Sequence, residues 1–112
     1  SAETPAVSVI LSASGSHSFQ YSDDVSSPDG DIEDWIQFTP YTPTTLLILD
    51  CFGIATPTLE VLQNNSSVQE LTCGDKVVID TSGGNAYLIH VKSNSAGTLQ
   101  YTSYILQVVS IP

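Results

Sequence analysis

Short runs of β-forming residues, separated by turn residues, constrain the fold of this chain more than any other feature. No segment of useful length has the helical spacing of apolar residues. Runs rich in Val, Ile, Leu, Thr and Tyr alternate with clusters of Gly, Pro, Asn, Asp and Ser. They predict eight to nine short strands: Val7 to Leu11, Ser16 to Tyr21, Glu33 to Thr39, Thr45 to Cys51, Thr58 to Gln63, Val68 to Thr72, Lys76 to Asp80, Ala86 to Lys92 and Leu99 to Val109.

Strands at this spacing predict an all-β fold, an antiparallel β-sandwich resembling a jelly roll. The length of 112 residues fits one domain spanning positions 1–112, with residues 1–6 as an N-terminal extension. Because the chain opens with Ser1 and contains no Met, we expect a mature domain, or one excised from a longer precursor.

Alternation along the strands predicts which side chains form the core. Ile36 and Phe38 share one face of their strand, and Trp35 and Gln37 share the other. The segment 46–49 is apolar on both faces and is therefore expected in a central strand. Further core positions expected from the same alternation are Tyr87, Ile89, Val91, Tyr104, Leu106 and Val108.

The chain is strongly acidic, with twelve Asp and Glu against two Lys and a net charge of -10. Polyanions such as nucleic acids and anionic membrane surfaces are excluded as partners on this ground. No apolar run approaches the ~20 residues of a membrane span. A hydrophobic content of 41% still predicts a globular domain, which we expect to be a monomer.

Cys51 and Cys73 lie in separate strand-like segments, and two cysteines without a CxxC or HxxxH pattern do not make a zinc site. A disulfide is the favoured interpretation, with two buried free thiols as the alternative. The acidic, lysine-poor and Ser/Thr-rich composition indicates a secreted, extracellular protein.

Half of the acidic residues cluster between positions 23 and 34: Asp23, Asp24, Asp29, Asp31, Glu33 and Asp34. Carboxylates this close repel one another unless a cation neutralises them, and calcium takes six to eight oxygen ligands. Asp29, Asp31 and Glu33 stand at alternate positions, and Gly30 permits a tight turn between the first two. The alternatives are a calcium site and a solvated loop that provides solubility and protects an edge strand.

The sequence does not predict an enzyme. It contains no G-x-S-x-G nucleophile elbow, and neither His17 nor His90 has a metal-binding partner at short spacing. A carboxylate pair among the clustered acids would still need a walled substrate cleft, for which 112 residues leave little room.

Trp35, the single Trp, alternates with Gln37 on the face predicted to lie outside the core. An exposed aromatic on a sheet face is a common platform for sugars and for proline-rich or collagenous peptides. His90 and Tyr101 would extend this ligand-binding surface if their strands were neighbours. The alternative is a structural role for Trp35, covered by an adjacent loop or domain.

Five segments in order resemble the bacterial pre-peptidase C-terminal domain family. Asp34 to Phe38 is similar to its Asp-Trp-Tyr-x-Phe strand, and Thr45 to Leu49 to the apolar strand that follows. Pro57 to Leu62 resembles a third strand without its Asp. Gly84 to Val91 resembles the Gly-x-Tyr-Tyr-Ile-Arg-Val strand with His90 at the Arg position, and Tyr104 to Val108 the terminal Tyr-x-Leu-x-Val strand. The similarity spans positions 16 to 109.

This resemblance implies a jelly-roll-like, non-catalytic domain attached to secreted hydrolases, most often proteases. Such domains aid secretion, are removed in maturation, or bind the polymer that the enzyme degrades. The similar collagen-binding domains of collagenases hold calcium through acidic residues nearer the N-terminus, so calcium carries over only as an analogy of chemistry. The expected partner is a parent hydrolase domain or an extracellular polymer, protein or polysaccharide. The alternative function is a carbohydrate-binding module or an adhesive module of a cell-surface protein.

Overall fold

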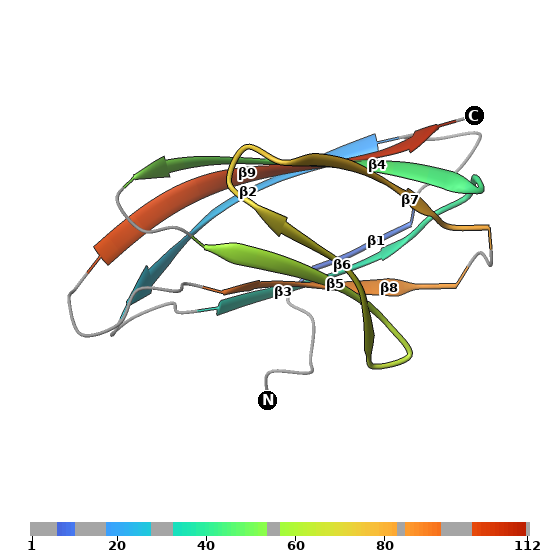
Figure 1. The fold of residues 1–112 in the computed structure, drawn as a ribbon, viewed down its shortest axis with the longest axis horizontal. Coiled ribbons are helices and arrows are strands. Elements are labelled where there is room, and N and C mark those ends of the chain that lie inside the picture. Colours follow the sequence, from blue (N-terminus) through green and yellow to red (C-terminus); the bar gives the residue numbers. More distant parts are fainter. Residues whose placement is uncertain are drawn as a thin grey trace.

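Two β-sheets pack face to face in the computed structural model (Figure 1). The structure describes residues 7–10, 18–27, 33–53, 57–82, 85–92 and 100–111. Its strands are β1 (Val7–Ile10), β2 (Ser18–Ser27), β3 (Glu33–Thr39), β4 (Thr44–Gly53), β5 (Thr58–Gln63), β6 (Ser66–Thr72), β7 (Lys76–Asp80), β8 (Tyr87–Lys92) and β9 (Gln100–Ile111). One sheet has five strands in the order β1-β3-β8-β5-β6, and the other has four in the order β2-β9-β4-β7.

The pairing of β2 to β9 is nested, as in a long hairpin wound into two layers. β2 pairs with β9, β3 with β8, β4 with β7 and β5 with β6, and every one of these pairs is antiparallel. Further ladders join β4 to β9 and β5 to β8. This is a jelly roll, to which β1 adds a parallel strand beside β3. The predicted all-β sandwich is confirmed.

The tip of the wound hairpin is the turn between β5 and β6. Gln63 pairs with Ser66, so Asn64 and Asn65 form a two-residue loop. Their φ angles are 52° and 65°, the left-handed values that a type I′ turn requires at both central residues. Asparagine tolerates this region better than most residues, so the sequence supports the turn locally.

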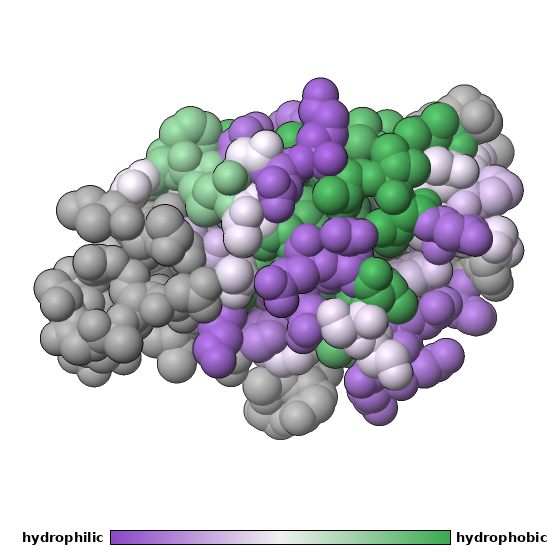
Figure 2. Space-filling view, viewed as in Figure 1, coloured by the Kyte–Doolittle hydropathy of each residue, from purple (hydrophilic) through white to green (hydrophobic). Residues whose placement is uncertain are grey.

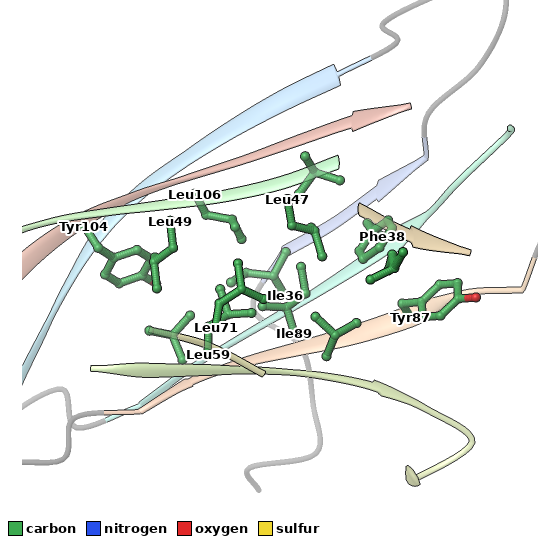
Figure 3. Close-up of a cluster of buried hydrophobic side chains, with 14 residues drawn as sticks. Ile36, Phe38, Leu47, Leu49, Leu59, Leu71, Tyr87, Ile89, Tyr104 and Leu106 are labelled. Atoms are coloured by element: carbon green, nitrogen blue, oxygen red, sulfur yellow. The ribbon is translucent and has the colours of Figure 1, made fainter. Parts of the chain in front are cut away.

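The core fills the space between the sheets. Ile36, Phe38 and Ile89 project from the five-stranded sheet toward Leu47 and Leu106 of the four-stranded sheet (Figure 3). The predicted core positions are all buried, and β4 lies between β9 and β7, as expected from its apolar faces. Alternation therefore predicted the inner faces of β3, β8 and β9 correctly.

The strand bounds differ from the predictions mainly in β2. Its predicted end at Tyr21 is wrong, because the strand continues through Asp23 and Asp24 to Ser27. The long ladder with β9 carries these polar residues, with Asp23 opposite Tyr104. The first predicted residues of this strand, Ser16 and His17, lie outside the described residues.

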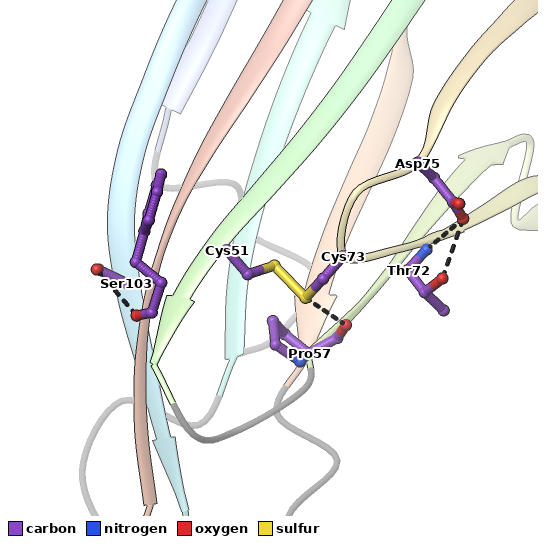
Figure 4. Close-up of a disulfide and its surroundings, with 7 residues drawn as sticks. Cys51, Pro57, Thr72, Cys73, Asp75 and Ser103 are labelled. Carbon is purple, nitrogen blue, oxygen red and sulfur yellow. Dashed lines mark hydrogen bonds between the residues drawn. A yellow bond between two sulfur atoms is a disulfide. The ribbon is translucent and has the colours of Figure 1, made fainter.

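The predicted disulfide between Cys51 and Cys73 is present, with its Cα atoms 5.5 Å apart (Figure 4). It ties β4 of the four-stranded sheet to the turn that leaves β6 of the other sheet. In that turn Gly74 has a φ of 88°, and its amide donates to the Leu49 carbonyl at 2.8 Å. A structural disulfide of this kind is typical of the periplasm or the extracellular space.

Candidate functional site

The outer face of the five-stranded sheet carries the residues best suited to recognition. Alternation turns Ile36 and Ile89 inward and leaves Trp35 and His90 half-buried on the other face. The ladders place Trp35 opposite His90, His90 opposite Glu60, and Glu60 opposite Glu70. We call these four residues the Trp35 row. It crosses four neighbouring strands, β3, β8, β5 and β6.

Trp35 and His90 stack on one another. Their ring centroids are 4.0 Å apart and their planes differ by 7°. One face of the indole is therefore covered by the imidazole, so Trp35 offers no open platform on the β8 side. Its Nε1 is buried and has no hydrogen-bond partner within the part of the chain that the structure describes.

A shallow hollow of about 240 Å³ lies beside the row. The side chains of Leu62 and Leu88 provide its apolar part, and Gln37, Asn64 and Asn65 provide amide groups. Amides around an apolar floor suit a small polar group or one side chain of a partner. Gln37, a predicted ligand-binding residue, therefore lines a cavity next to Trp35.

Two described carboxylates lie on this face. Glu70 is exposed and Glu60 is half-buried beside His90. The neighbouring register position pairs Glu33 with Lys92, one of the two lysines of the chain. With a net charge of -10, the chain attracts basic partners and repels acidic ones.

Among the described residues, the positions paired with His90 carry no nucleophile. The residues directly opposite His90 are Trp35 and Glu60, and neither carries a hydroxyl or a thiol. A histidine base needs such a group within hydrogen-bond reach to generate a nucleophile.

Tyr101 does not join this surface. It lies in β9, in the four-stranded sheet, where its backbone pairs with Ser26. The predicted grouping of Tyr101 with Trp35 and His90 is therefore wrong. Alternation assigns a residue to a face of its strand, but it does not say to which sheet the strand belongs.

Of the six clustered acids, Asp34 is the one whose side chain the structure describes. Asp29 and Asp31 lie outside the described residues, and Asp23, Asp24 and Glu33 are described only as backbone positions in β2 and β3. The described residues contain no group of three His, Cys, Asp or Glu able to hold a metal ion. The calcium site therefore stays a prediction.

Asp34 has a structural partner. Its buried Oδ2 accepts a hydrogen bond from the Tyr104 hydroxyl at 2.6 Å. Since Asp34 belongs to β3 and Tyr104 to β9, this bond joins the two sheets. The Asp34 carboxylate, which the sequence analysis places among the candidate calcium ligands, thus helps to hold the two sheets together.

The predicted calcium site at the acidic segment can be tested through thermal stability. If the ion binds, excess calcium should raise the melting midpoint by about 10 to 15 °C, because a ligand present at ~100 times its dissociation constant adds about 2.7 kcal/mol. EDTA should reverse the rise, and Asp29→Asn with Asp31→Asn should abolish it. Magnesium at the same ionic strength is the control. Identical melting midpoints with calcium and with EDTA would contradict a calcium site in this chain.

Sequence reasoning missed the acidic half of the Trp35 row and the asparagines of the hollow. Glu60 stands between the core residues Leu59 and Val61, so its outward direction was readable from alternation. Its position beside His90 was not readable, because it depends on the pairing of β5 with β8. At Asn64 and Asn65 the sequence indicates a polar turn, with two overlapping glycosylation sequons as the alternative, and it does not indicate a binding hollow.

Comparisons with known proteins establish the fold alone. No protein-family model matches the chain, and no curated protein matches it. The described residues contain no helix long and apolar enough to span a membrane. Among solved structures, the chain is similar to PliG of Aeromonas hydrophila, a periplasmic lysozyme inhibitor of g-type lysozyme, with a TM-score of 0.57 and 15% identity over 94% of this chain and 99% of that one. The resemblance to pre-peptidase C-terminal domains stays a prediction.

Proposed function

We propose that this chain is a non-catalytic, secreted domain that acts in partnership with a hydrolase. The contact surface in this proposal is the outer face of the five-stranded sheet, centred on the Trp35 row. The observation that carries it is the aromatic stack beside two carboxylates and an apolar hollow, on a face that the core does not use. A half-buried tryptophan with a polar rim is typical of protein contact sites.

Two independent lines support a hydrolase as the partner. The pre-peptidase C-terminal resemblance associates the sequence with secreted hydrolases, mostly proteases. The structurally similar PliG is an inhibitor of a hydrolase, g-type lysozyme. Either an attached accessory domain or a separate inhibitor would use a binding face of this kind. The negative charge of the chain favours a basic surface on the hydrolase.

A carbohydrate-binding or adhesive module is the second candidate. The hollow favours it, because the amides of Gln37, Asn64 and Asn65 surround the apolar side chains of Leu62 and Leu88. The stack disfavours it, because His90 covers one face of the only tryptophan. Sugar stacking requires an open aromatic face.

The test is calorimetric binding to a panel of purified hydrolases, namely a g-type lysozyme, a secreted serine protease and a secreted metalloprotease. We expect at least one to bind, with its activity lowered if the chain is an inhibitor and unchanged if it is an accessory domain. Trp35→Ala should weaken that binding by at least about thirtyfold, corresponding to the 2 kcal/mol typical of a central interface residue.

Val78→Ser, on the other sheet, is the matched control and should leave the affinity unchanged. Soluble chitin, cellulose and peptidoglycan fragments form a second panel. Binding to these glycans, with none to any hydrolase, would replace the proposed function by the carbohydrate-binding one. Hydrolase binding that Trp35→Ala leaves intact would move the contact away from this face.

A further inference from the structure

Strand β7 has an edge that no other described strand pairs with. Among the described residues it is the last strand of the four-stranded sheet and pairs only with β4. Its outward side chains are exposed, Val78 to 59%, with Lys76 and Asp80 on either side. In Figure 2, hydrophobic side chains gather over the part of the molecule where β4 and β7 lie in Figure 1. A strand edge of this kind is a template for pairing with another strand.

The register of β7 fixes which backbone groups face that open edge. The Thr81 amide donates to the Pro43 carbonyl at 2.7 Å, and the Leu49 amide donates to the Asp75 carbonyl at 3.0 Å. In an antiparallel ladder, hydrogen-bonded pairs recur at every second residue, so residues 77 and 79 also bond to β4. Lys76, Val78 and Asp80 therefore direct their amides and carbonyls to the open edge. The Asp80 carbonyl already accepts the Tyr87 hydroxyl at 3.2 Å, and its second lone pair is available to a partner strand.

We propose that two copies of this chain pair through β7, antiparallel about a two-fold axis at Val78. The segment Lys76-Val77-Val78-Ile79-Asp80 is complementary to itself in this register. Lys76 then lies opposite Asp80 of the partner subunit, and Val78 opposite Val78 of the partner subunit. Several antiparallel registers would pair the amides and carbonyls at the open edges of the two strands. In this register alone, all five residues of one β7 lie opposite the five residues of the other.

The side chains around β7 favour a second copy over an unrelated strand. Each dimer would contain two cross-strand Lys–Asp pairs, and opposite charges directly opposite one another stabilise antiparallel pairs. Hydrogen bonds from Ser82 lower the pKa of the Asp80 carboxyl, so it stays ionised at neutral pH. Val78 extends a row formed with Leu46 and Val109 on the same face, and pairing would continue that row across the dimer.

This dimer is independent of the proposed hydrolase contact, which lies on the other sheet. It differs from the monomer expected from the sequence. Repulsion between two chains of net charge -10 opposes dimerisation. The association should therefore be measured near 0.15 M salt, because charges more than roughly 8 Å apart are then screened while the Lys–Asp pairs in direct contact are much less affected.

Sedimentation equilibrium between ~10 µM and ~1 mM covers the affinities expected of a small interface. We expect the wild-type chain to dimerise in this range. Lys76→Asp and Asp80→Lys should each weaken dimerisation by at least about tenfold, because each turns two attractive cross-strand pairs into repulsive ones. An equimolar mixture of the two variants should form a heterodimer. The double variant, with the charges exchanged, should dimerise like the wild type.

Lys92→Asp and Glu70→Lys make matched charge changes on the other sheet and should dimerise normally. The mixture and the double variant control for folding. If the single variants were misfolded, neither the mixture nor the double variant would regain dimerisation. A wild-type chain that stays monomeric to ~1 mM would overturn the proposal. The occupant of this edge would then be a peptide of another protein and not a second copy of the chain. A dimer unaffected by both single variants would also overturn it.

Discussion

Replacing both cysteines, with Cys51→Ser and Cys73→Ser, is expected to lower the free energy of unfolding by about 3 kcal/mol. The disulfide closes a loop across a sequence separation of 22, and the chain-entropy model gives about this value for such a loop. The loop contains the whole β5–β6 hairpin, which the bond anchors to β4. The melting midpoint should fall by about 10 to 20 °C, as expected for a domain of this size.

Urea unfolding of the wild type, the double variant and the reduced wild type checks this expectation. The double variant and the reduced wild type should agree, since both lack only the cross-link. A loss below about 1 kcal/mol would mean that the hairpin stays anchored to β4 without the bond.

Tyr104→Phe is expected to lower the free energy of unfolding by about 2 kcal/mol. The hydroxyl donates to Asp34 Oδ2 at 2.6 Å, with Tyr104 only 1% exposed and Asp34 only 8% exposed. Removing the donor leaves a buried carboxylate with one hydrogen bond fewer, and bonds to charged groups contribute about 1.5–3 kcal/mol. The phenyl ring keeps the packing, so the loss reports on the hydrogen bond.

Tyr87→Phe is the matched control. Its hydroxyl donates to the neutral carbonyl of Asp80 at 3.2 Å, so we expect a loss of about 1 kcal/mol or less. A double-mutant cycle of Tyr104→Phe with Asp34→Asn measures the coupling between the two groups by urea unfolding. Coupling below about 0.5 kcal/mol would show that this bond contributes little to holding the sheets together.

The sequence predicted the strands well because short alternating runs with clear turns carry their own signal. β3, β5 and β7 begin and end as predicted, and the inward residues of β8 and β9 are those that alternation indicates. The exception, β2, contains Asp23 and Asp24, which have low strand propensity. There, pairing with the long strand β9 outweighs local preference.

Contacts between strands could not be predicted, since they depend on which strands are neighbours. The bond between Asp34 and Tyr104 joins residues 70 positions apart, and Trp35 meets His90 only because β3 pairs with β8. For the same reason, Tyr101 was placed with Trp35 although it lies in the opposite sheet. Trp35, Gln37 and His90 do lie on neighbouring strands, β3 and β8.

The central claim, that a hydrolase contacts the outer face of the five-stranded sheet, is tested most directly by NMR titration. Trp35 is the only tryptophan, so the indole N–H gives a single signal at the centre of the Trp35 row. Adding a hydrolase that binds in calorimetry should shift that signal and the amides of Gln37, Glu60 and His90, and leave those of β7 unchanged. Shifts confined to the four-stranded sheet, with the indole signal unmoved, would contradict the claim.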